Sequence, residues 1–205
     1  MLNVKKYNFM DFNTVEIFEK EIASFFGSPY AVAVDSCTHG IEICLRHLKS
    51  EKIIVPVRTY ISIPFLANKI GINMEWSYSK WKDYYFLTEE IADAAVLWKR
   101  NSYIKDKFMC ISFQYQKHLS LGRGGAILCP DLKSYKELKK ISYDGRVPNI
   151  PWRDQNIKTI GYHYYMTPET AQLGLNKIEG AKIKQPRDWK YEDWPDISRF
   201  EIFTK

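Results

Sequence analysis

Lys117 is the residue of this chain whose surroundings best suit chemistry. It stands in residues 111–128, ISFQYQKHLSLGRGGAIL, after an apolar and aromatic run and before a glycine turn and a second apolar run. This pattern predicts a strand, a loop that holds the lysine, and a second strand. Burial there would disfavour the ammonium, lower its pKa and leave an amine able to attack a carbonyl, which is how lysines bind pyridoxal phosphate. The alternative is an ordinary lysine of a hairpin loop.

A turn of small residues, Ser36, Cys37 and Thr38, is the second candidate. It joins a predicted buried strand, YAVAVDS from Tyr30, directly to a helical pattern. Such a turn points free backbone N–H groups and a hydroxyl at one place, where the helix dipole favours a phosphate. The competing interpretation is that Ser36 or Thr38 only caps the helix.

Asp93, in the run EEIADAAVLW, is the third candidate. A carboxylate that follows an apolar approach and precedes two alanines is suited to lie beneath a cofactor ring and to stabilise a protonated pyridine nitrogen. A helix-capping aspartate is the competing interpretation.

The elements that must position these residues alternate between strands and helices. This order implies a mostly parallel sheet that is covered on both faces. Strands are predicted over residues 30–36, 52–56, 72–76, 108–114 and 125–129. Helices are predicted from Asn13 to Gly27, over 41–50 and 59–70, from Asp131, and from Thr167 to Gly180.

The composition limits the class of protein. With 205 residues, 45% of them apolar, the chain can bury the core of one domain, and no apolar run approaches the roughly 20 residues that span a bilayer. We therefore expect a cytoplasmic protein that does not bind membranes. The four cysteines form no CxxC pair, which predicts reduced core thiols and no metal site. The net charge of +6 suits an anionic partner, but it is spread over short clusters, and we expect no nucleic-acid partner.

Several sequence blocks, in this order, resemble the DegT and StrS family of sugar aminotransferases. The resemblance covers roughly residues 12 to 183. The blocks are SCT at 36–38, TY at 59–60, DAA at 93–95, SFQYQK at 112–117, GRGGAIL at 122–128 and GYHYYMTPETAQLGL at 161–175.

This resemblance implies a fold, a reaction and an assembly. Members of the family are fold type I pyridoxal phosphate enzymes, so residues 1–183 are expected to form a compacted, three-layer α/β/α large domain. The family's homodimers transfer an amino group, usually from glutamate, to a keto sugar attached to a nucleotide. Residues 184–205 are expected to be a tail that is a remnant of, or a replacement for, the family's C-terminal small domain.

The resemblance also assigns the reacting residues. Lys117 matches the lysine that forms the internal aldimine and, once released by substrate, shuttles the proton. Asp93 matches the partner of the pyridine nitrogen, and Tyr60 the aromatic residue that stacks on the ring.

The phosphate of the cofactor has its own matching residues. Cys37, Thr38 and His39 match the turn that binds the phosphate, chiefly through backbone N–H groups. Ser112 matches a serine that adds a hydroxyl. His163 matches an asparagine that reaches the phosphate from the other subunit, so the resemblance implies a dimer with a shared site.

The chain also departs from the family pattern. Val96 stands where His or Gln usually lies near the ring hydroxyl, and Arg123 stands where an acidic residue usually precedes the glycine pair. His163 and Tyr165 replace an amide and a guanidinium, and tyrosine supplies no fixed charge. Residues 77–92 are too few for the strand and helix expected there, and the C-terminal small domain is expected to be absent or reduced.

Two other functions of the same fold compete with transamination. The dehydratase branch has a histidine in place of the lysine, whereas this chain has Lys117 with His118 only as its neighbour. A non-catalytic homologue that binds a sugar nucleotide, or pairs with a full-length subunit, is favoured by Val96 and the expected lack of the small domain. Transamination is the function that the lysine predicts.

Overall fold

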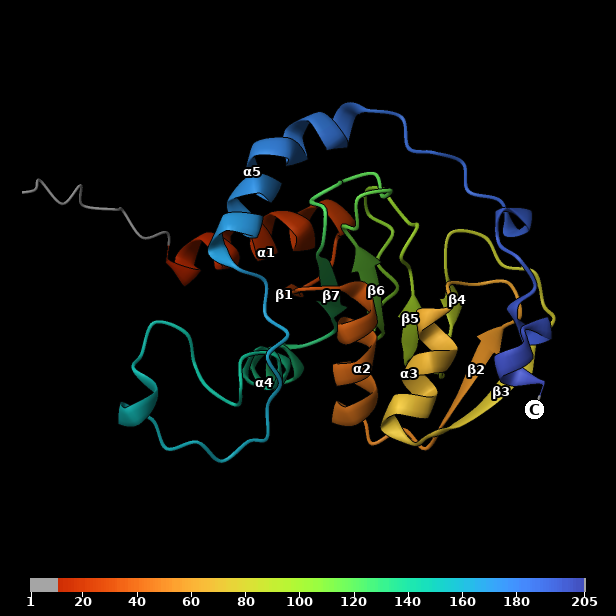
Figure 1. Ribbon diagram of the computed structural model, residues 1–205. Helices are drawn as coiled ribbons and strands as arrows, with labels where there is room; N and C mark the ends of the chain where they lie inside the picture. Colours follow the sequence, from red (N-terminus) through yellow and green to blue (C-terminus); the bar gives the residue numbers. More distant parts are fainter. Residues whose placement is uncertain (1–10, 205) are drawn as a thin grey trace, which may run out of the picture.

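The computed structural model, which describes residues 11–204, contains one central sheet and a smaller strand pair (Figure 1). The segment predicted to be too short for a strand and a helix contains a two-residue strand, Tyr85–Phe86, and no helix over residues 78–90. The five-stranded sheet has the order β1 (Tyr30–Val34), β7 (Gly125–Cys129), β6 (Phe108–Ser112), β5 (Ile91–Asp93) and β4 (Tyr85–Phe86). The pair consists of β2 (Lys52–Pro56) and β3 (Asn73–Ser77).

The strand directions correct the prediction of a mostly parallel sheet. Strands β5 and β6 are parallel, as are β2 and β3, whereas the pairs β1–β7, β6–β7 and β4–β5 are antiparallel. The reason is that β7 follows β6 through a loop without a helix, and a chain that returns without a crossover pairs antiparallel. Strand β7 then lies between β6 and β1, so β1, β6 and β5 share one direction, and their carboxyl ends meet at one edge.

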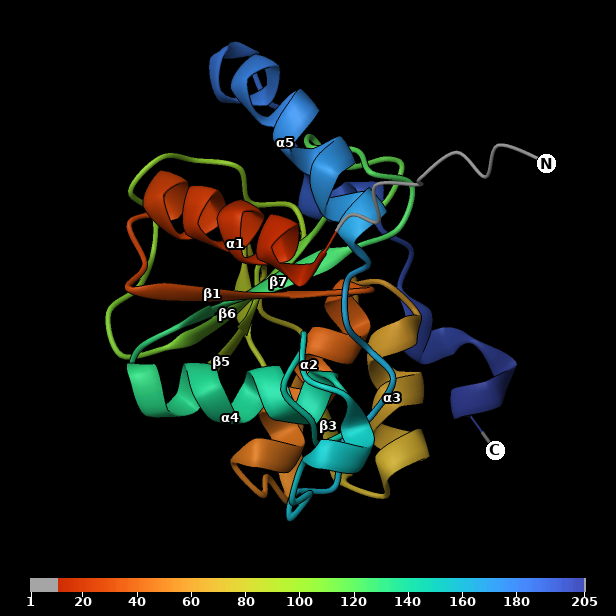
Figure 2. The same ribbon diagram turned by 90° about the vertical axis from the view of Figure 1, so that its left-hand side faces the viewer.

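Within residues 11–204, five α-helices cover the two faces of the sheet. Figure 2 shows α1 and α5 on one face and α2, α3 and α4 on the other, which confirms the expected three layers. Each face has its own buried apolar cluster. The helices are α1 (Phe12–Phe26), α2 (Cys37–His47), α3 (Ser62–Ile70), α4 (Leu132–Ser142) and α5 (Pro168–Ile183).

Several predicted helix ends lie elsewhere in the structure. Helix α1 begins after Asp11, whose side chain accepts a hydrogen bond from the Asn13 N–H, so Asn13 is not the cap. Helix α3 begins at Ser62, because Thr59 instead bonds to a tyrosine of the sheet. Helix α5 continues past Gly180 to Ile183, and two side chains donate hydrogen bonds to the carbonyl of its last turn at Ala181.

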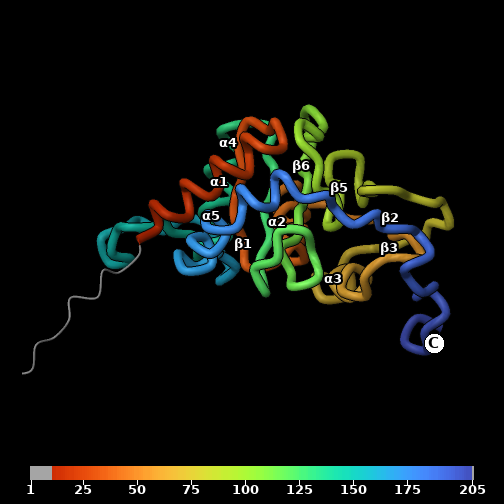
Figure 3. Tube along the Cα trace, turned by 90° about the horizontal axis from the view of Figure 1, so that it is seen from above, coloured from red at the N-terminus to blue at the C-terminus, as the bar shows by residue number. Residues whose placement is uncertain are grey.

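The tail after α5 crosses the carboxyl edge of the sheet. Figure 3 shows its trace passing over the strand ends from α5 towards β2 and β3. Its end is fixed by a hydrogen bond from the Ile197 N–H to the Val57 carbonyl of 2.8 Å. The ring of Phe203 packs against Trp76 and Phe65. Three short 3-10 helices form within the tail, at Tyr191–Asp193, Ile197–Arg199 and Glu201–Phe203.

Two glycines of α5 allow a matched test of the packing between α5 and α1. A Cβ on Gly174 would lie 2.5 Å from the buried ring of Phe18, whereas a Cβ on Gly180 would meet nothing within 4 Å. We expect Gly174→Ala to lower the free energy of unfolding by roughly 1–3 kcal/mol because it overpacks this contact. Gly180→Ala should raise it by up to about 1 kcal/mol through helix propensity. Urea unfolding measures both, and equal stabilisation by the two changes would contradict the packing.

Candidate functional site

A cavity of about 260 Å³, called here the main cavity, lies at the edge where β1, β5 and β6 end. Strands β4, β5 and β6, the first turns of α2 and α3, and the tail contribute residues to its walls. Most of the residues predicted from the sequence line it, namely Cys37, Thr38, Tyr60, Asp93, Ser112 and Lys117.

Lys117 lies in the loop between β6 and β7, as predicted. Its backbone N–H donates to the Gln114 carbonyl at 2.8 Å, and the Tyr115 N–H donates to the Gly122 carbonyl at 3.0 Å. These bonds close the loop into a turn that holds the lysine at the sheet edge. The loop is therefore ordered by its own backbone and not only by contacts of the lysine.

The Lys117 ammonium is half-buried, and charges of both signs surround it. Burial lowers its pKa, the Asp93 carboxylate opposes that effect, and the positive charge of Arg187 adds to it. The nitrogen also lies 4.7 Å from the ring centroid of Trp189 and 5.4 Å from that of Trp194. Cation–π attraction of this kind favours the charged form. Burial and Arg187 thus favour the neutral amine, whereas Asp93 and the two indoles favour the ammonium.

Asp93 ends strand β5 and is buried. Its carboxylate accepts a hydrogen bond of 2.5 Å from the Tyr85 hydroxyl and one of 3.0 Å from the Ala95 N–H. The Cys37 thiol lies at 3.9 Å from the same group. Burial raises the pKa of Asp93, and the hydrogen bonds and the Lys117 charge only partly offset this. Residues 94–107, which follow it directly, form no helix, so Asp93 is not a helix cap.

The turn at residues 36–38 begins α2, and it both caps the helix and leaves donors free. The Ser36 hydroxyl accepts from the His39 N–H at 3.2 Å. The N–H groups of Cys37 and Thr38 have no acceptor within residues 11–204. A Cβ on Gly125 would lie 2.5 Å from the Cys37 nitrogen, so only glycine permits this approach of β7 to the turn. The free N–H groups at a helix start suit an anion.

One family of known proteins matches most of the chain. The DegT/DnrJ/EryC1/StrS aminotransferase family matches residues 4–96 and 99–190. The chain belongs to that family. No curated protein matches the sequence, and no helix within residues 11–204 has the length and apolar character to cross a bilayer.

Solved structures of similar fold are longer than this chain. Spr1654 from Streptococcus pneumoniae, designated a sugar aminotransferase and solved in its PLP form, has a TM-score of 0.70 at 16% identity over 85% of this chain and 61% of that one. The sugar aminotransferase CalS13 from Micromonospora echinospora gives 0.67 at 15%, over 82% and 60%. A 3-amino-5-hydroxybenzoic acid synthase gives 0.65 at 19%, over 82% and 56%. The chain thus has their α/β fold and spans about three fifths of their length.

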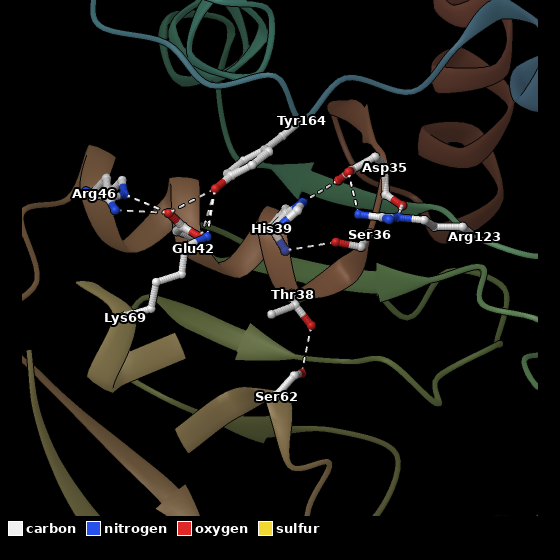
Figure 4. A network of polar contacts seen from close by, with 10 residues as sticks. All are labelled: Asp35, Ser36, Thr38, His39, Glu42, Arg46, Ser62, Lys69, Arg123 and Tyr164. Atoms are coloured by element: carbon white, nitrogen blue, oxygen red, sulfur yellow. Dashed lines mark hydrogen bonds and ion pairs between the residues drawn. The ribbon is translucent and has the colours of Figure 1, made fainter. Parts of the chain in front are cut away.

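His39, predicted at the phosphate turn of this family member, does not line the main cavity. Its ring stacks on Tyr164 with centroids 3.7 Å apart, and its Nδ1 lies 2.7 Å from Asp35 (Figure 4). Asp35 also pairs with Arg123, which does line the cavity, at 2.8 Å. His39 therefore supports the turn through its contact with Asp35, from outside the main cavity.

His163 also lies away from the main cavity of its own chain. Its side chain is 72% exposed, with Nδ1 at 3.0 Å from Asp144 and Nε2 at 3.2 Å from the Tyr165 hydroxyl. Tyr165 itself packs against Phe12 and Tyr143. His163 therefore takes no part in the main cavity of its own chain.

The structure also brings residues into the site that sequence reasoning missed. Tyr85 joins Asp93 to Thr59, whose hydroxyl lies 2.5 Å from the tyrosine oxygen. Trp194 reaches the cavity from the tail, and its buried indole N–H has no hydrogen-bond partner in the described part of the chain. The abundance of tryptophan in the tail was the only available signal for this contact. Val96, noted as a departure from the family, lines the cavity as an apolar residue.

Replacing Asp93 tests whether this carboxylate is held at a cost to stability. The pKa of Asp93 in the folded protein lies above the ordinary 3.8, so the folded state binds the proton more tightly than the unfolded state. The free energy of unfolding therefore falls as the pH rises from 3.8 through the folded pKa. Asp93→Asn can still accept from Ala95 and donate to Tyr85, without a buried charge. We expect the ligand-free variant to lose less stability than the parent between pH 4 and pH 8, by urea unfolding. Asp106→Asn, at an exposed position, is the control, and a greater loss in Asp93→Asn than in the parent would contradict this account.

Proposed function

We propose that this chain is a pyridoxal-phosphate-dependent aminotransferase that acts on a keto sugar linked to a nucleotide, with an amino donor such as glutamate. The observation that carries the proposal is the convergence of Lys117, the buried Asp93 and the turn at residues 36–38 on one cavity. Membership in an aminotransferase family supports it. The PLP-form structure of similar fold supports the choice of cofactor.

The residues of the main cavity fit pyridoxal phosphate on the evidence of this chain alone. The N–H groups of Cys37 and Thr38 are free donors at a helix start, and the Ser112 hydroxyl lines the same cavity. Asp93 offers a buried carboxylate for a protonated ring nitrogen. The unpartnered indole N–H of Trp194 adds a donor that a ligand oxygen would satisfy.

The roles of the side chains follow from their positions. When bound, pyridoxal phosphate supplies an electron sink for the carbon that carries the amino group. Lys117 would bind the cofactor carbonyl and, once released, would carry a proton on its Nζ between the two carbons joined to the transferred nitrogen. Asp93 holds the proton at the ring nitrogen, and Tyr60, whose side chain is exposed on the cavity wall, covers the ring. The tail, residues 184–204, takes part in closing the site.

A non-catalytic homologue that binds a sugar nucleotide or pairs with a longer subunit is the second candidate. Val96 favours it, because this wall of the cavity has no hydrogen-bond donor side chain at that position. The same cavity would then bind a ligand without turnover. An amino-donor experiment separates the two candidates.

Lys117→Ala tests the proposed function directly. The parent protein, incubated with pyridoxal phosphate, should gain a visible absorbance band that borohydride bleaches while fixing the cofactor to Lys117, as peptide mass spectrometry would locate. The variant should lack the band because no other lysine lines the main cavity within residues 11–204. Lys133→Ala, exposed on α4, is the matched control and should keep it.

The outcomes decide between the candidates. The same band in Lys117→Ala, or no band in the parent, contradicts the cofactor assignment. If the band forms but neither glutamate nor another amino donor converts the cofactor to its pyridoxamine form, the non-catalytic homologue is the correct function.

A shared active site predicts complementation between two variants that are impaired in different residues of that site. We propose that His163 of one subunit donates to the cofactor phosphate in the other, so His163→Ala should weaken cofactor affinity about tenfold, as for a lost hydrogen bond to a charged group. In a mixture of Lys117→Ala and His163→Ala chains, a mixed dimer contains one site with both residues intact. High-affinity, borohydride-fixed cofactor should therefore reappear in the mixture. Sedimentation that shows only monomer would exclude the shared site.

A further inference from the structure

A second cavity, of about 290 Å³, also borders Lys117 and is built largely by the tail. We call it the tail cavity. It shares Val96, Gln116 and Lys117 with the main cavity. Its own walls include His118, Lys184, Arg187 and Trp189. The two cavities therefore meet at the proposed reacting amine.

The side chains that line the tail cavity include positive charges and no carboxylate. Lys117, Lys184 and Arg187 line it, and no aspartate or glutamate does. Lys184 has no ion-pair partner within residues 11–204. A concave surface of one charge sign concentrates ligands of the other sign. The cavity is therefore suited to an anion.

Arg187 is held in a fixed orientation at this cavity. Its Nη2 lies 3.1 Å from the Asp193 carboxylate, and its guanidinium lies 3.8 Å from the ring centroid of Trp189. Asp193 is in turn fixed by the Lys190 N–H at 3.2 Å. A guanidinium has five N–H donors, so the single contact with Asp193 leaves others available. The side chain remains 60% exposed.

The wall opposite the tail is also ordered. The Nε2 of His118 donates to the Ala181 carbonyl at 2.8 Å, and its ring packs on Trp98 with centroids 5.3 Å apart. The end of α5 thus fixes His118, while the tail that follows α5 fixes Arg187. A preorganised site of this kind loses less entropy when it binds a ligand.

We propose that the tail cavity binds the anionic group of the substrate, a carboxylate of the amino donor or the diphosphate of a nucleotide, with Arg187 as its main contact and Lys184 beside it. The proposal rests on the proposed function, because it places the remainder of the substrate at Lys117. Planar guanidinium groups bind carboxylates and phosphates through paired hydrogen bonds. The tail would then supply both the anion site and, through Trp194, a wall of the main cavity.

The test compares two arginines of the tail. Arg187→Gln removes one positive charge from the wall of the tail cavity. Arg199→Gln removes an equal charge from an exposed side chain that pairs with Asp196 and lines neither cavity. Calorimetric titration with glutamate and with uridine diphosphate, at physiological ionic strength, gives the affinities. Tryptophan fluorescence offers a second readout because Trp189 lines the cavity.

We expect Arg187→Gln to weaken binding of one of these anions by about tenfold or more, and Arg199→Gln to change it less than twofold. Loss with glutamate assigns the cavity to the donor carboxylate, and loss with uridine diphosphate assigns it to the nucleotide. Arg187→Lys, which keeps the charge but not the paired donors, should recover part of the affinity. Unfolding curves of each variant show whether the tail remains folded.

Equal affinities in the parent and Arg187→Gln, or equal losses in both glutamine variants, would overturn the proposal. These binding measurements need no turnover, so their failure is distinct from that of the proposed function. If Lys117 forms no cofactor complex but Arg187→Gln still loses the anion selectively, the aminotransferase assignment fails and the anion site stands.

Discussion

The close approach of Gly125 to the start of α2 is the constraint on which the site depends. Gly125 pairs with Val34 on one side and with Ser112 on the other, and a Cβ at this position would overlap the Cys37 backbone. The antiparallel strand β7 can therefore begin directly beside the turn that follows β1. This places the free N–H groups of α2 next to the end of β6, and the parallel pairing of β6 with β5 brings Asp93 to the same edge.

Two buried carboxylates illustrate the difference between a structural acid and an acid of the site. Glu42 is fully buried, but Arg46 and Lys69 pair with it at 3.0 and 2.8 Å, and Tyr164 lies near (Figure 4). Asp93 has neutral donors and only the more distant charge of Lys117, and burial raises its pKa. A buried carboxylate that has a raised pKa and no directly paired cation is typical of ligand sites.

Elements formed by neighbouring residues were predicted from the sequence, whereas contacts between distant segments were not. The strand, loop and strand around Lys117, the strand before Ser36 and the α/β layers follow from short-range patterns. The contact of Tyr85 with Thr59 and the crossing of the tail join segments that are 26 or more residues apart, which periodicity does not encode. The antiparallel direction of β7 was missed because the parallel sheet was inferred from the alternation of strands and helices elsewhere in the chain. The loop between β6 and β7 contains no helix, and two strands joined in this way pair antiparallel.

The tail places the positive charge of Arg187 where it acts on Lys117. The positive charge of Arg187 lowers the pKa of that lysine, while the indoles of Trp189 and Trp194 favour its ammonium form. An anion held by Arg187 would offset the charge of the guanidinium, so the pKa of Lys117 would rise when the substrate binds. A lysine that must first attack a carbonyl as a neutral amine, and later accept a proton, benefits from this order of events. The same tail residues would therefore both hold the substrate and adjust the base to it.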